Sequence, residues 1–114
     1  MQTLDNITAD SKQKHVIITP DGGAITIQIE YKPQQNGWFF TSIEYGDFTL
    51  KGIRICTSPN LLHQYINQIP FGFMVTSKEN FEPTQQEDFF QKNSVMYLLS
   101  EEECQNYLDY LNNG

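Results

Sequence analysis

A chain of 114 residues is the size of one domain, and it can bury a hydrophobic core without disulfides or metals. Its formal net charge is −7, and the excess acid lies in residues 79–114, where eight Asp and Glu accompany only Lys92. Because nucleic-acid-binding proteins normally carry a basic surface, this distribution argues against a specific nucleic-acid partner. The apolar runs are too short to cross a membrane, so we also expect no membrane span.

The first third of the chain predicts a polar arm followed by strands. Residues 1–14 are polar without a strict period, and we expect an arm that is disordered or ordered by a partner. A short strand is predicted over residues 15–19, and a turn over 20–23. The alternation of apolar and polar residues over 24–31 is the strongest strand signal in the chain. Its predicted core residues are Ile25, Ile27 and Ile29.

The middle of the chain predicts a hairpin. Residues 38–45 and 48–56 are rich in aromatic and β-branched residues, and they flank a turn at 45–47. Gly52 interrupts the second strand, which suggests a bulge or a sharp bend. Further predicted core residues in this region and the next strand are Phe39, Ile43, Leu50 and Val75.

The last half predicts helical turns, two strands and a terminal helix. We expect a helical turn from Pro59 or Asn60, a second one from a capping box at 84–87, and a helix from the capping box at 100–103 to about Leu111. Strands are predicted at 71–76 and 95–99. Five or six strands with one short inserted helical turn and a C-terminal helix predict a mainly β fold, a small antiparallel barrel over residues 15–114.

The sequence holds no recognisable catalytic or metal-binding set. His15 and His63 are the only imidazoles, and no nucleophile is paired with them in any known spacing. The consecutive acids Glu101–Glu103 would point in different directions on a helix, which makes a poor cation cage. We therefore expect no enzyme activity, no metal and no cofactor.

The cysteines and one aromatic cluster each leave an alternative open. Cys56 and Cys104 predict two buried free thiols, with a disulfide as the alternative. Residues 38–40 are three consecutive aromatic residues, which pack in a core or across strands more often than they form a stacking platform for bases or sugars.

Several apolar residues fall where loops or strand ends are predicted. Such residues either close the end of a barrel or form a contact patch for a partner. The candidates for a partner interface are Leu61, Leu62, Phe71, Phe73, Phe89 and Phe90.

The order of several short motifs carries a resemblance to a known family. It runs through Gly37-Trp38-Phe39-Phe40, the hairpin turn, Gly52-Ile53, Asn60-Leu61-Leu62, the strand from Phe71, Pro83-Thr84 and the strand from Val95 to the acids at 101–103. Over residues 15 to 104 the chain resembles the baseplate plug proteins of contractile-tailed bacteriophages, small proteins with an OB-like barrel.

The resemblance implies a non-enzymatic structural protein of the virion, in the tail baseplate and assembled in the host cytoplasm. It would plug or bridge the central hub of a contractile tail as a symmetric homo-oligomer, with other baseplate hub, tail tube or spike proteins as partners. The alternative is an OB-type module that binds single-stranded nucleic acid or an oligosaccharide.

Overall fold

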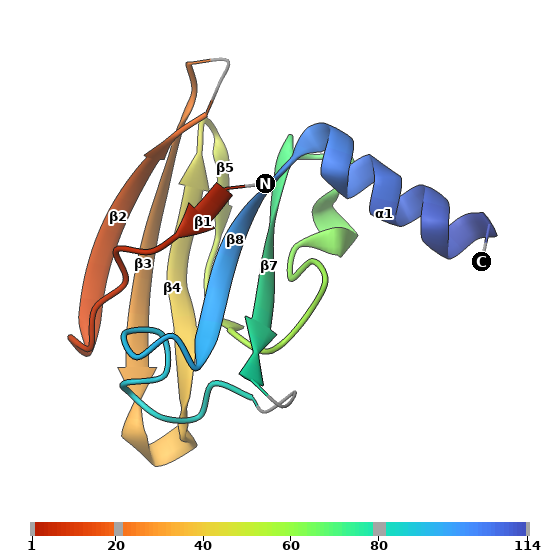
Figure 1. The fold of residues 1–114 in the computed structure, drawn as a ribbon. Helices are drawn as coiled ribbons and strands as arrows, with labels where there is room; N and C mark the ends of the chain where they lie inside the picture. Colours follow the sequence, from red (N-terminus) through yellow and green to blue (C-terminus); the bar gives the residue numbers. More distant parts are fainter. Residues whose placement is uncertain (1, 20–21, 79–81, 114) are drawn as a thin grey trace.

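The computed structural model describes residues 2–19, 22–78 and 82–113 (Figure 1). The described residues form eight strands, two short 3-10 helices and one α-helix. In chain order these elements are β1 (Gln2–Leu4), β2 (Lys12–Ile18), β3 (Ala24–Lys32), η1 (Pro33–Gln35), β4 (Gly37–Tyr45), β5 (Phe48–Leu50), β6 (Ile53–Arg54), η2 (His63–Tyr65), β7 (Phe71–Ser77), β8 (Ser94–Ser100) and α1 (Glu101–Asn113).

The strands form two antiparallel sheets around one core. The larger sheet has the order β2-β3-β4-β5, with β6 also paired to β4, and the smaller sheet has the order β1-β8-β7. Aromatic residues join the two layers, since the rings of Phe40 on β4 and Phe73 on β7 lie 5.3 Å apart. The fold is thus mainly β with a C-terminal helix, as predicted. The strands of the described residues do not form a closed barrel. An isolated β-bridge between Ser58 and Val75 connects the segment after β6 to β7.

A β-bulge in β4 decides which aromatic residues enter the core. Ile29 pairs with Phe40 while Gln28 pairs with Ser42, so Thr41 is an extra residue that reverses the alternation of β4. Trp38 and Phe40 precede the bulge and point into the core, and Ile43 follows it and points the same way. Phe39 therefore lies half-buried on the outer face, outside the core to which the sequence assigned it.

The other predicted core residues lie at or beside the centre of the molecule. The three isoleucines of β3 and Val75 on β7 are fully enclosed. Leu50 is half-buried and packs against the core from β5. The strand pairing is interrupted between β5 and β6, as predicted at Gly52. The φ of Gly52 is +74°, which lies in the region that favours glycine.

The N-terminal segment is part of the fold and not a separate arm. β1 pairs with β8, with Gln2 opposite Leu98 and Leu4 opposite Met96. Leu4 and Ile7 are buried in the core, and β2 already begins at Lys12. Two large aliphatic residues in a mostly polar segment are enough to anchor it, because burial removes each of these side chains from water.

The C-terminal helix begins with the predicted capping box. The Ser100 N–H donates to Glu103 Oε1 at 3.0 Å, and the Glu103 N–H donates to Ser100 Oγ at 3.2 Å. The capping box predicted at 84–87 is absent from residues 84–92, where the chain forms turns and the Gln85 N–H donates to Asp88 Oδ2 at 2.9 Å. Figure 1 shows α1 extending away from the two sheets. No helix among the described residues is both long and apolar enough to cross a membrane.

Candidate functional site

Five of the six apolar residues proposed as interface candidates lie in or against the protein's own core. Leu62, Phe71, Phe73 and Phe89 are buried, and Leu61 is half-buried and packs on the core. Phe90 is the exception, with 59% of its surface exposed. The structure does not bring the six together into one surface.

Asn60 holds the loop that turns Leu62 inward. Its side-chain Oδ1 accepts the Leu62 N–H at 3.0 Å, and its Nδ2 donates to Sγ of Cys104 on α1 at 3.6 Å. Gly72 of β7 lies so close to Asn60 that a Cβ at position 72 would collide with the Asn60 side chain. This buried contact therefore ties a loop, a strand and the helix together.

The loop between β7 and β8 closes the opposite end of the core. The Tyr31 hydroxyl donates to the Thr84 carbonyl at 2.7 Å, and Trp38 Nε1 donates to the Gln85 carbonyl at 3.3 Å. The ring of Phe89 meets Trp38 edge to face, with centroids 6.2 Å apart. Phe89 thus fills the end of the core, which is the alternative role that the sequence left open for it.

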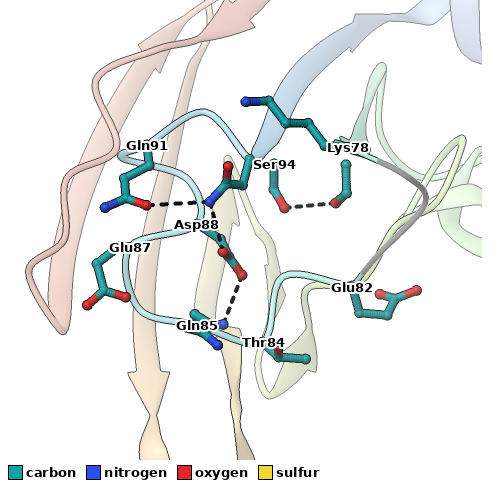
Figure 2. Close-up of a pocket in the computed structure, with 10 residues that line it drawn as sticks. Lys78, Glu82, Thr84, Gln85, Glu87, Asp88, Gln91 and Ser94 are labelled. Carbon is teal, nitrogen blue, oxygen red and sulfur yellow. Dashed lines mark hydrogen bonds between the residues drawn. The ribbon is translucent and has the colours of Figure 1, made fainter.

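A pocket of about 520 Å³ lies between this loop and the ends of β7 and β8 (Figure 2). Some of its polar groups bond to one another: Asp88 accepts the Gln85 N–H, and the Ser77 and Ser94 hydroxyls lie 2.8 Å apart. Figure 2 shows Glu82 and Glu87 pointing outward on either side of Asp88. The bonded groups hold the loop in shape, and the pocket contains no histidine or cysteine.

The residues that could carry chemistry are spread over the molecule. His15 Nε2 lies 3.0 Å from Gln13 Oε1 on the larger sheet, and burial lowers the pKa of His15. His63 packs edge to face on Tyr107, with centroids 5.2 Å apart. No cluster of three or more metal-ligating side chains occurs in the described parts of the chain.

The two cysteines are free thiols, Cys104 buried and Cys56 half-buried. The sequence predicted both thiols to be free and buried, so Cys56 is more exposed than expected. Burial and the nearby Glu103 carboxylate raise the pKa of the Cys104 thiol to about 11.

The outer face of β4 carries one aromatic ring with two cations. Lys32 Nζ lies 5.0 Å and Arg54 Cζ lies 5.3 Å from the centroid of the Phe39 ring. Arg54 also donates to the carbonyls of Gln35 and Asn36, each at 3.2 Å. Trp38 and Phe40, the other two rings considered for stacking, are fully buried. The outer face therefore offers one partly covered ring in place of an open aromatic platform.

Two exposed apolar pairs were not identified from the sequence. On β2, Val16 is 58% and Ile18 is 64% exposed, and on α1, Tyr110 is 71% and Leu111 is 46% exposed. For β2, the alternation of residues 12–18 contained the signal, since residues 12, 14, 16 and 18 of a strand share one face. For α1, the helix extends away from the two sheets, so the sequence alone does not tell which of its apolar residues are covered.

Comparison with known proteins gives a family. Residues 1–102 of the 114 match the family model described as cyanophage baseplate Pam3 plug gp18. A comparison with curated proteins finds no match. The match spans every strand of both sheets and reaches the first turn of α1. The chain therefore belongs to the phage baseplate plug family represented by the Pam3 cyanophage plug gp18.

Proposed function

We propose that the protein is a non-enzymatic structural component of a phage tail baseplate that plugs or bridges the central hub of a contractile tail. The match of residues 1–102 to a baseplate plug family carries this proposal. The proposed partners are other hub proteins and the tail tube or spike. The chain acts there as a symmetric homo-oligomer in the virion after assembly in the host cytoplasm.

The structure of the loop between β7 and β8 supports a role in which the protein acts through contacts with partners and not through catalysis. The loop between β7 and β8 is held at the start of its turn, where Tyr31 donates to the Thr84 carbonyl and Trp38 donates to the Gln85 carbonyl, and its Phe89 is buried. Hydrogen bonds join Gln85 to Asp88 and Ser77 to Ser94 within its pocket. A plug under mechanical load needs loops that keep their shape, and these contacts provide that rigidity.

The OB-like barrel belongs to the same proposal. β4 pairs with β6, the Ser58–Val75 bridge leads on to β7, and β8 and β1 follow in the smaller sheet. β1 faces β2 across a pocket of about 340 Å³ that is lined by residues 2–7 and 15–18. To form a barrel in the assembled tail, the edge strands β1 and β2 would have to pair across this pocket.

Genetic complementation tests the structural role. In a phage that carries this gene, its disruption should leave tails without a working baseplate, and the wild-type chain supplied in trans should restore infectious particles. Ile27→Asp places a carboxylate in the core and should abolish rescue, because a buried unpaired charge costs several kcal/mol, which is comparable to total stability. Gln28→Asp, on the exposed face of the same strand, is the matched control and should rescue. Normal infectious particles without any copy of the gene would contradict the proposal.

The alternative function is favoured by one observation, the cations beside Phe39. If this face bound single-stranded nucleic acid, fluorescence anisotropy with labelled oligonucleotides would give a micromolar dissociation constant that weakens steeply with salt. We expect no measurable binding at physiological salt, because the chain has a net charge of −7. Binding that is lost in Phe39→Ala would replace the structural role with the binding module. An oligosaccharide array, read with the same variant, tests the sugar-binding form of this alternative.

A further inference from the structure

The exposed apolar residues of the fold gather at two distant places. Four of the five large hydrophobic side chains that are exposed among the described residues lie on β2 or α1. Figure 1 shows these two elements at opposite sides of the molecule, with α1 pointing away from the sheets. One chain therefore cannot cover its own α1 residues with its own β2.

The β2 surface is a basic and apolar row at the edge of the larger sheet. β2 pairs with β3 on one side and is the end strand in the sheet order. Its outward row, named here the β2 row, consists of Lys12, Lys14, Val16 and Ile18, all of them exposed. The cations lie at one end of the row and the apolar pair at the other.

The α1 surface has the opposite charge. The helix carries Glu101, Glu102, Glu103 and Asp109 and no Lys or Arg. Tyr110 follows Glu103 by seven residues and so lies on the same face, beside Leu111. The name α1 face is used for the acidic first turn, Glu101–Glu103, together with Tyr110 and Leu111.

The spacing of charge and apolar residues on the two surfaces agrees. Four strand residues separate Lys14 from Ile18, which is about 13 Å at the rise of a strand. Seven to nine helical residues separate the acidic first turn, Glu101–Glu103, from Tyr110, which is about 11–14 Å at the rise of a helix. A helix laid along the β2 row can therefore place acid against Lys14 while Tyr110 and Leu111 cover Val16 and Ile18.

We propose that the α1 face of one copy docks on the β2 row of the next copy, in a head-to-tail contact. This inference rests on the proposed function, because a plug on the tail axis would be a closed ring, and head-to-tail contacts form a ring when their rotation closes. Most of α1 lies beyond residue 102, where the family match ends, so the contact is argued from the residues of this chain.

Two complementary variants of the purified full chain test the contact. The row variant carries Val16→Asp and Ile18→Asp, and the helix variant carries Tyr110→Asp and Leu111→Asp. Sedimentation velocity should show concentration-dependent association of the wild type and at least about tenfold weaker association for each variant alone, since each loses two buried apolar side chains. An equimolar mixture should form a dimer and nothing larger, because one intact row meets one intact helix.

The controls separate this inference from misfolding and from the proposed function. Phe90→Asp changes an exposed apolar residue outside both surfaces and should associate like the wild type. All variants should melt like the wild type, because each substitution is at an exposed position. A wild type that stays monomeric up to about 1 mM, or a mixture that does not associate, overturns the inference. Either result leaves the complementation test of the structural role unaffected.

Discussion

Asn60 shows how much of this fold depends on a single polar side chain. Its amide lies between the loop after β6, Gly72 and the Cys104 thiol. A buried hydrogen-bonding group without its partner costs about 1–3 kcal/mol. Asn60→Ala leaves the Leu62 N–H unpaired, so we expect a loss of that size in the free energy of unfolding, measured by urea denaturation. The exposed Asn67→Ala is the matched control and should change little.

Gly72 and Asn60 should be energetically coupled. In the wild type, Gly72→Ala forces its new methyl group into the Asn60 side chain, and overpacking of this kind costs about 1–3 kcal/mol. In the Asn60→Ala background the obstacle is gone, so the same substitution should cost about 1 kcal/mol less or become neutral. A double-mutant cycle of unfolding free energies measures the coupling. Additive costs would show that the two side chains do not restrain each other.

The Cys104 thiol links stability to high pH. Its pKa is about 11 in the folded protein and 9.0 for the ordinary thiol, so folding favours the neutral form. The stability that this provides is fully present below pH 9.0 and is lost as the pH rises toward about 11. Urea midpoints of the wild type should therefore fall more steeply over this range than those of Cys104→Ala. Parallel curves would mean that the thiol ionises as easily in the folded chain as in the unfolded one.

At the scale of elements, regular alternation was the most dependable signal. β3 could be predicted because Ile25, Ile27 and Ile29 alternate with polar residues and face one core. The position of β4 could be predicted, but not which of its side chains face the core. The bulge at Thr41 arises from pairing with β3, and the local sequence gives no sign of it. Phe39 was placed in the core for that reason. The candidate surfaces on β2 and α1 were missed because their exposure depends on which elements end up beside them.

The N-terminal segment illustrates the limit of composition. Residues 1–14 have the polarity of a loose arm, yet Leu4 and Ile7 insert into the core and β1 extends the smaller sheet. Whether Leu4 and Ile7 become buried depends on core residues that lie far away in the sequence. Polar composition alone therefore gave the wrong prediction for this segment.

A substitution in this segment tests its place in the fold. Ile7→Ala should lower the free energy of unfolding by about 2–4 kcal/mol, because it removes a buried aliphatic side chain and leaves a cavity. The exposed neighbour Asn6→Ala serves as the control. Chemical denaturation of both variants is the measurement. Equal stability of Ile7→Ala and wild type would restore the interpretation of a separate arm.

At the scale of the whole molecule, acidic and basic residues lie on opposite sides. Four acids lie on α1 at one side, and Lys12 and Lys14 lie on β2 at the other. A protein with opposite charges on opposite sides favours ordered head-to-tail neighbours over random contacts. This polarity, on a rigid two-sheet core, is what a plug built from several copies would use.

The central claim is that the chain is a structural part of the tail baseplate, and its position in the virion tests it most directly. Tails purified from phage that carry this gene should contain the protein, and antibody-gold labelling in electron micrographs should place it at the baseplate end, on the tail axis. Cryo-electron microscopy of the same tails should show the two-sheet fold at that position in a symmetric set of copies. Complete, infectious tails in which the protein is absent from the baseplate would contradict the account.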